Sequence, residues 1–542
     1  MRNETLTSSD SFTFDQASQL YQDISTALLT AREWKNSFTP INRLSDDVLS
    51  LIPTYLPSQI DRLRASFVCR RWRRALLQRA ELWCQLFLSK GQDYLETMLE
   101  RAKGSALGVF FDHIGQESIT ADFLSTTMTL SMYSHQITCL DLKCSAWWDV
   151  RWFSKGFYGP LSLLHTLIID VAEEYEIRYP GTSPWFFSNA INLKVFRFHS
   201  TADRSPSLSY FFFPNLVSFD LSVAPTRFHF TQLLDFLEAS PALRTVHMKI
   251  GGHAPIHGTR DRVVVLPNVE KFTLIMATCY DYEIATHISC PSAKYTSLVH
   301  QEAITYGFSQ PFPNSVSLWD AIVQRDTGFP LEEVTLEIKT AGIITCILTF
   351  WSSDATTIEL RHEVTVYRDE GIPEDAVQTR CEELKGEIFT RATETIRSHP
   401  QLANVRRLRI CDNPTHPTQV SRVACDAEYL LKSLGPLDEL VLHRCDLLPY
   451  LLSFFDFPRR HVEAPVVYPP IKELTFSHPV NLFDGGRGAI TKFAKSQHAS
   501  GIPFERVIVR GERIPRGMEE ALRLWVGSAE CYREEVCETD RD

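Results

Sequence analysis

The 542-residue sequence has no Cys-x-x-Cys pair, no Gly-x-Ser-x-Gly elbow and no His-Glu-x-x-His motif. The usual signs of a structural zinc site, a serine hydrolase and a zinc protease are therefore missing. The most apolar window, residues 341–351, is too short to span a bilayer. The N-terminal residues do not form a charged segment followed by an apolar one, so we expect no secretory signal. These absences predict a cytoplasmic or nuclear protein that does not span a membrane.

A strong excess of charge of either sign is also missing. The net charge is −11 and charged residues make up 22% of the chain, which argues against nucleic acid as the main ligand. Thirteen cysteines are scattered without a repeated spacing, and in an intracellular protein they are expected to be reduced thiols. We therefore expect no nucleic acid, no metal and no cofactor among the ligands.

The few segments that suggest catalysis have simpler interpretations. Cys139 and Cys144, like Cys531 and Cys537, lack the further ligands that zinc requires. Residues 484–492 are rich in glycine but lack the Gly-Lys-Ser/Thr ending of a phosphate-binding loop. We therefore predict no catalytic residues and no enzyme activity, and an active site hidden in residues 337–400 ranks lowest among the alternatives.

What the sequence does contain begins with an apolar, helix-patterned stretch at residues 41–88. Its first apolar run has helical spacing and stops at Pro57, and two further runs follow. A core of this size is marginal alone, so its surplus apolar surface implies a partner within or outside the chain. The three runs contain Leu44, Val48, Leu49, Ile52 and Leu56; then Leu63, Phe67, Val68, Trp72 and Leu76; then Leu82, Trp83 and Leu86.

This stretch resembles an F-box. Ser45 replaces the usual proline, and Pro53 stands where an aromatic residue is common and should end the first helix early. The alternative is a helical subdomain that caps its own neighbour. The residues that match the family pattern are Leu44, Asp47, Val48, Leu49, Ile52, Leu56, Pro57, Asp61, Val68, Cys69, Trp72, Leu82 and Trp83.

The resemblance implies that the helices dock on the Skp-type adaptor, and through it on a cullin, in a Skp–cullin–F-box ubiquitin ligase. The adaptor-binding residues that it implies are Leu44, Val48, Leu49, Ile52, Leu56, Val68, Cys69, Trp72, Leu82 and Trp83.

A repeated apolar unit occupies most of the remaining chain. Eleven copies, apolar at the first, fourth and sixth positions, run from Ile137 to Val509, mostly 23–34 residues apart. Because the fourth and sixth positions lie on one face of a strand, stacked units predict a parallel sheet over a continuous core. Residues 231–241 have a helical pattern between two units.

The repeats resemble an irregular leucine-rich-repeat solenoid. Cys445 and Asn413 stand where an Asn or Cys side chain of that family bonds backbone groups of the turn. The alternative is a non-solenoid α/β domain with buried strands. The predicted fold class is thus α/β, with a three-helix F-box followed by parallel strands with helical or irregular return segments. The whole chain resembles an F-box protein of the fungal type with a leucine-rich-repeat-like C-terminal region.

The predicted organisation has four parts. Residues 1–40 hold a disordered segment and an amphipathic helix, 41–90 the F-box, 91–526 the solenoid with an insertion at about 337–400, and 527–542 a charged tail. We expect the amphipathic helix to pack on the F-box, with a partner helix as the alternative. Its apolar face consists of Leu20, Ile24, Ala27, Leu28, Ala31 and Trp34.

The predicted function is that of a substrate-recognition subunit, with the solenoid holding a target protein that the sequence does not identify. The alternative is a protein-interaction scaffold with a degenerate F-box that acts outside any ligase. Ser45 and Pro53 favour this alternative.

Overall fold

The structure is a computed structural model that describes residues 14–112, apart from Pro57, and much of the chain beyond. The further described ranges are 121–145, 161–172, 190–201, 211–223, 230–251, 262–276, 282–305, 331–340, 343–352, 356–367, 404–412, 433–443, 470–477, 487–499, 501–511 and 517–533, with isolated short runs between them.

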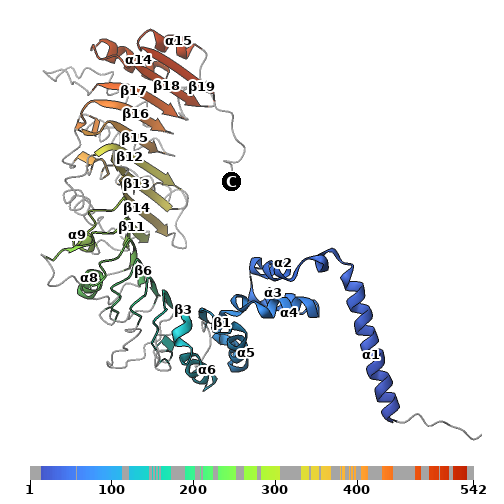
Figure 1. The fold of residues 1–542 in the computed structure, drawn as a ribbon. Helices are drawn as coiled ribbons and strands as arrows, with labels where there is room; N and C mark the ends of the chain where they lie inside the picture. The colour runs from blue at the N-terminus through green and yellow to red at the C-terminus, as the bar shows by residue number, and fades with distance from the viewer. Residues whose placement is uncertain are drawn as a thin grey trace, which may run out of the picture.

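Three parts follow one another along the chain: one long helix, a small helical module and a solenoid (Figure 1). The module comprises α2–α4 and the short 3-10 helices around them. The elements of the first two parts are α1 (Phe14–Ser37), η1 (Pro40–Arg43), α2 (Asp46–Leu51), η2 (Ile52–Tyr55), α3 (Gln59–Ser66), α4 (Arg70–Gln78) and η3 (Ala80–Trp83).

The solenoid is built on one sheet of 17 strands. Its helices are η4 (Leu88–Lys90), α5 (Gln92–Ala102), α6 (Ala121–Ser131), η5 (Ser134–Gln136), α8 (Phe230–Glu238), α9 (Tyr282–Thr286), α14 (Arg487–Ala499) and α15 (Met518–Arg523). Its strands are β1 (Gln85–Phe87), β2 (Leu107–Asp112), β3 (Ile137–Cys144), β4 (Thr166–Val171), β5 (Val195–Ser200), β6 (Ser218–Val223), β7 (Thr245–Ile250), β9 (Lys271–Met276), β11 (Tyr295–Thr305), β12 (Leu331–Thr340), β13 (Ile343–Ser352), β14 (Thr357–Tyr367), β15 (Arg407–Asp412), β16 (Leu437–His443), β17 (Ile471–Ser477), β18 (Arg506–Gly511) and β19 (Ser528–Arg533). Strands β8 (Val264–Val265) and β10 (Ile288–Ser289) pair separately.

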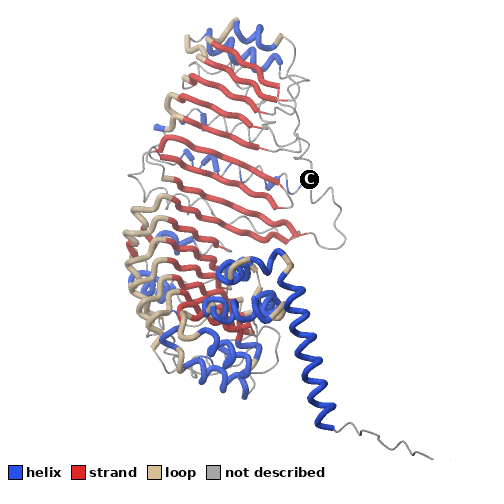
Figure 2. The backbone as a smooth tube through the Cα atoms, turned by 45° about the vertical axis from the view of Figure 1, so that its right-hand side comes forward, coloured by secondary structure: helices blue, strands red, loops and turns tan. Residues whose placement is uncertain are grey.

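The sheet consists of two parallel arms joined by a three-stranded meander. Each strand pairs in parallel with the next from β1 to β11 and again from β15 to β19. Between the arms, β14 lies beside β11, β13 runs antiparallel to β14 and β12, and β12 pairs in parallel with β15. Figure 2 shows these strands as one continuous stack. The chain is thus an α/β solenoid of leucine-rich repeats that continues through residues 331–367.

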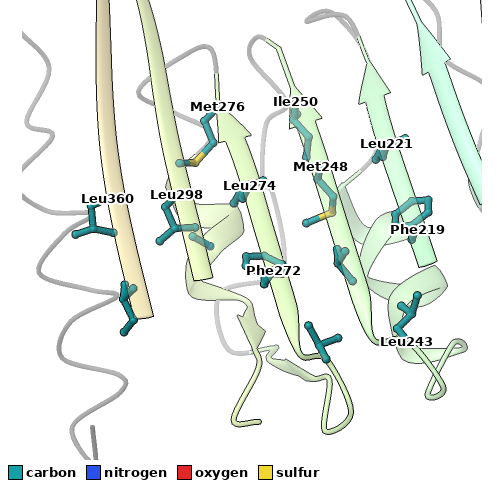
Figure 3. Close-up of a cluster of buried hydrophobic side chains, with 14 of the residues drawn as sticks. Phe219, Leu221, Leu243, Met248, Ile250, Phe272, Leu274, Met276, Leu298 and Leu360 are labelled. Atoms are coloured by element: carbon teal, nitrogen blue, oxygen red, sulfur yellow. The ribbon is translucent and has the colours of Figure 1, made fainter. Parts of the chain in front are cut away.

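The repeated unit places its apolar residues as the sequence predicts. The fourth positions of successive units form one row, in which Leu167 faces Phe196 and Phe196 faces Phe219. The sixth positions form a second row, which includes Leu221, Met248, Leu274 and Leu298 (Figure 3). All eleven units coincide with strands of the sheet. Burial of both rows in all eleven units supplies the continuous core.

Asparagines bond the repeats to one another just before the strands. The Nδ2 atoms of Asn192, Asn215 and Asn268 donate to carbonyl oxygens of the preceding turn at 2.8–3.0 Å. Each of these asparagines directly precedes the first apolar residue of its unit. The two turn residues that were predicted after a strand, Asn413 and Cys445, lie outside the described residues.

The elements of the structure differ from the predicted boundaries at several points. The second apolar run of the helical module is two helices, because the chain is extended at Cys69, which caps α4. The third run is η3 followed by β1, so the sheet begins at Gln85 within the predicted 41–90 domain. The segment predicted as an insertion at 337–400 contributes β13 and β14 to the sheet itself. Strand β19 occupies Ser528–Arg533, which was predicted to be tail.

Candidate protein-interaction surfaces

The helical module is held by a small buried core and by polar contacts across it. Leu49, Trp72, Leu76 and Trp83 are buried, and the indole Nε1 of Trp83 donates to the Leu76 carbonyl at 3.0 Å. The Nε of Arg71 pairs with the Asp46 carboxylate at 2.7 Å, joining α4 to the start of α2. The two helices are therefore fixed relative to each other by apolar packing and by an ion pair.

The two departures from the F-box pattern have local structural roles. Ser45 caps α2, since its Oγ accepts a hydrogen bond from the Val48 amide at 3.4 Å. Pro53 is buried, and α2 ends at Leu51, after which the chain continues as the 3-10 helix η2. The early end of the first helix that Pro53 predicts is confirmed.

The ten residues that the F-box resemblance implies for adaptor binding fall into three groups. Four are buried inside the module and support its surface from within, and their role in adaptor binding stays a prediction: Leu49, Trp72, Leu82 and Trp83. Four are partly buried: Leu44, Ile52, Leu56 and Cys69. Two are exposed: Val48 and Val68.

Five further large apolar residues of the module are exposed, and none of them is among these ten. They are Ile41, Leu51, Tyr55, Ile60 and Phe67. Their exposure follows from the fold, since an amphipathic run does not reveal which of its apolar residues the neighbouring helices cover. Val48, Leu51 and Tyr55 have helical spacing and lie on one side of α2–η2. We call this exposed row, together with Leu44, the α2 face.

A polar junction joins the module to the first turn of the solenoid. Gln59 on α3 is buried, and its Nε2 donates to the carbonyl of Gln85 on β1 at 2.7 Å. The hydroxyl of Tyr94 on α5 donates to the Gln59 Oε1, and burial raises the pKa of Tyr94 to about 12. The Arg101 guanidinium lies over the Trp83 ring, 4.8 Å from its centroid. These contacts fix the orientation of the α2 face relative to the solenoid.

The uncovered face of the sheet carries charged side chains in rows that cross the strands. In the first arm, His199 lies between two aspartates, with Nδ1 3.1 Å from Asp170 and Nε2 3.4 Å from Asp220. Hydrogen bonds to Asp170 and Asp220 raise the pKa of His199 to about 9. Burial opposes ionisation of Asp220, yet its hydrogen bond with His199 leaves the pKa lowered. At neutral pH this part of the face therefore holds a charged triad.

The second arm uses arginine and glutamate instead. Arg407 contacts Glu333 on β12 and Glu439 on β16, at 3.6 and 4.0 Å. Arg506 likewise bridges Glu473 on β17 and Glu530 on β19, at 3.4 and 2.8 Å. Among the described residues, this face therefore carries side chains of both charges in both arms.

The described residues contain no group of three His, Cys, Asp or Glu side chains placed to hold a metal ion. Among the helices that the structure describes, none has the length and apolar content needed to cross a membrane.

Comparison with known families identifies the helical module. Residues 41–89 match the F-box-like family. The match covers α2–α4 and includes β1. It leaves the solenoid unmatched, so it describes one domain of this chain and not the whole protein. The fungal subtype and the predicted division into domains stay predictions.

Other comparisons add little about this chain. No curated protein matches it. One solved structure that it resembles is the leucine-rich-repeat ectodomain of the plant membrane receptor kinase GASSHO1/SCHENGEN3 from Arabidopsis thaliana, in complex with CASPARIAN STRIP INTEGRITY FACTOR 2. The TM-score is 0.22 at 11% identity, over 81% of this chain and 45% of that one. The chain thus spans less than half of that protein, and a likeness at this TM-score carries no argument.

Proposed function

We propose that this chain is the substrate-recognition subunit of a Skp–cullin–F-box ubiquitin ligase. Its F-box-like module would bind a Skp-type adaptor, and its solenoid would hold the target protein. In this proposal the chain itself performs no chemistry and needs no cofactor. Binding the target close to a ubiquitin-charged enzyme raises the effective concentration of the target's lysines there.

The observation that supports adaptor docking most directly is the α2 face. Val48 and Leu51 are 43% and 44% exposed, although the neighbouring Leu49 of the same helix is fully buried. Exposed apolar rows on a small folded module indicate a partner surface. Large apolar side chains that a partner buries usually dominate the binding energy of such interfaces.

The fixed junction supports the second half of the proposal. Because Gln59 and Tyr94 tie the module to the solenoid, an adaptor on the α2 face would have a set position relative to a target on the sheet. The mixed charges of the sheet face suit a folded protein surface better than a nucleic acid.

The second candidate is a scaffold that no longer binds an adaptor. The shortening of α2 at Pro53 favours it, because the first helix offers fewer turns for docking. The two candidates make opposite predictions about adaptor binding.

The deciding experiment is co-purification of the full chain with a purified Skp-type adaptor. We expect a one-to-one complex that the double variant Val48→Asp, Leu51→Asp loses. The matched control is Leu163→Asp, Val263→Asp, because these residues are 44% and 42% exposed but lie on the solenoid. Substitutions at Leu49 or Trp72 would not serve, since both residues are buried and their loss would unfold the module.

Circular dichroism of both double variants must match the unsubstituted chain for the comparison to count. Adaptor binding retained by the control and lost by the α2-face variant supports the ligase proposal. A well-folded chain that binds no adaptor would favour the scaffold.

A further inference from the structure

Helix α1 carries an apolar face that the described part of the chain leaves exposed. Leu20, Ile24 and Trp34 are 49%, 50% and 69% exposed, so the expected packing of this face on the F-box does not occur. The helix projects away from the module and the solenoid (Figure 1). Most of the stability of a helix in a protein comes from packing of its apolar face, so this face indicates a partner outside the chain.

The side of α1 that faces the module is the polar one. Glu33 Oε1 lies 3.4 Å from Arg70 Nη1 on α4. At 100° per residue, Glu33 projects from the side of the helix away from Leu20 and Ile24. This ion pair is therefore made by the polar side of α1 and does not cover its apolar face.

The apolar face has the spacing of a coiled-coil seam. Its residues alternate steps of three and four along all of α1, which is the heptad pattern of helices that pack side by side. The helix has 24 residues and is about 36 Å long at 1.5 Å per residue. The seam consists of Ala17, Leu20, Ile24, Ala27, Ala31 and Trp34.

We propose that two copies of this chain pair through α1 as an antiparallel coiled coil. When Phe14 of one copy is set opposite Ser37 of the other, the helices overlap completely. A large seam residue then faces a small one in every layer, which suits close packing. The layers are Leu20 with Ala31, Ile24 with Ala27, and Trp34 with Ala17, each formed twice by the two-fold axis.

The groove beside the seam and the flanking residues fit this arrangement. Ala27, Ala31 and Trp34 line a depression on α1 that a facing leucine would enter. On one flank Tyr21 would meet Leu28 of the second copy, and on the other Asp23 would meet Thr30. A parallel pair would instead stack Trp34 on itself next to two layers of alanine alone, which leaves gaps.

Antiparallel pairing places the two helical modules at opposite ends of the paired helices. Each α2 face stays open, so the dimer would present two docking surfaces. The inference goes beyond the proposed function and does not depend on it.

Sedimentation equilibrium of the full chain tests the pairing. We expect twice the chain mass at micromolar concentration and a twofold fall for Ile24→Asp. Leu29→Asp is the matched control, because Leu29 is an exposed apolar residue on the opposite side of the same helix. A monomeric unsubstituted chain, or an equal effect of both variants, would overturn the proposal.

A distance measurement tests the orientation. A spin label on an unnatural amino acid at Ser37 should give an interprotomer distance of about 35 Å, the length of the helix at 1.5 Å per residue. A distance near the interaxial spacing of about 10 Å would mean parallel pairing and overturn the antiparallel proposal. Adaptor capture by Ile24→Asp should equal that of the unsubstituted chain, so failure of either proposal is distinguishable from failure of the other.

Discussion

The solenoid and the N-terminal region treat large apolar side chains in opposite ways. In the solenoid, the repeated apolar positions that the structure describes are buried on strand after strand. More than half of the exposed large apolar side chains in the described residues lie between Phe14 and Val68. The solenoid buries its own apolar positions, whereas α1 and the helical module leave part of theirs exposed. Substitutions should therefore affect stability in one region and association in the other.

The largest effect on stability should come from the aromatic centre of the solenoid. Phe196 is fully buried, with Phe211, Phe213 and Phe219 at centroid distances of 5.0–5.9 Å. Phe196→Ala should lower the free energy of unfolding by about 3–5 kcal/mol, through lost burial and the cavity left behind. Urea unfolding followed by circular dichroism measures the change.

Phe212 provides the matched control for that substitution. Phe212 lies between Phe211 and Phe213 in the sequence but is 60% exposed. Phe212→Ala should therefore change the free energy of unfolding by less than about 0.5 kcal/mol. Equal effects of the two substitutions would contradict the packing described for this core.

Two neighbouring residues of α2 bring the same contrast within one helix. Leu49 is fully buried and Val48 is 43% exposed. Leu49→Ala should destabilise the module by about 2–5 kcal/mol, and Val48→Ala should cost less than about 0.5 kcal/mol. Amide hydrogen exchange of α2–α4 reports the stability of the module separately from that of the solenoid. Similar losses of protection in both variants would mean that Val48 belongs to the core.

Sequence patterning located the sheet well because its signal is repeated and local. It missed β11, where Thr296 occupies the row of buried apolar residues next to Phe272. It missed β19, because Ala529 and Cys531 are small and the same strand carries two charged residues, Glu530 and Arg533. The reversed order of β12–β14 was not predictable, since spacing along the chain does not determine which strands pair.

The exposed apolar residues of the helical module were harder to predict than the sheet. Helical spacing identified Val48 and Leu49 together, but the packing of α4 against α2 decides that Val48 is exposed and Leu49 is buried. The family pattern likewise includes core residues such as Trp72 and Trp83, because a pattern records what the fold needs as well as what the partner contacts. The His199 triad gave no signal, since its members come from three different strands.

The charged triad predicts a moderate, pH-dependent effect. The pKa of His199 is raised from 6.5 to about 9, so its stabilisation is fully present below about pH 6.5 and disappears as pH rises through 9. The side chain is 43% exposed, so screening by solvent should limit the effect to about 1 kcal/mol or less.

The urea midpoints of the unsubstituted chain and of His199→Gln at pH 6 and pH 9.5 measure this effect. The unsubstituted chain should be the more stable of the two at pH 6, and the difference should vanish at pH 9.5. A difference that is the same at both pH values would show that the triad does not depend on the charge of His199.

The smallest effect should follow from restoring the family's proline. Ser45 has φ −63° and Leu44 has φ −64° and ψ 147°, so both backbones already suit a proline at position 45. Ser45→Pro loses the cap of α2 but restricts the unfolded chain, and the two effects should cancel to within about 0.5 kcal/mol. Ser45→Ala loses the cap without that gain and should cost about 0.5–1 kcal/mol. Amide hydrogen exchange of α2 in the two variants measures which of them is the more stable. A proline variant less stable than the alanine variant would show that the backbone of Ser45 has a role that its dihedral angles do not reveal.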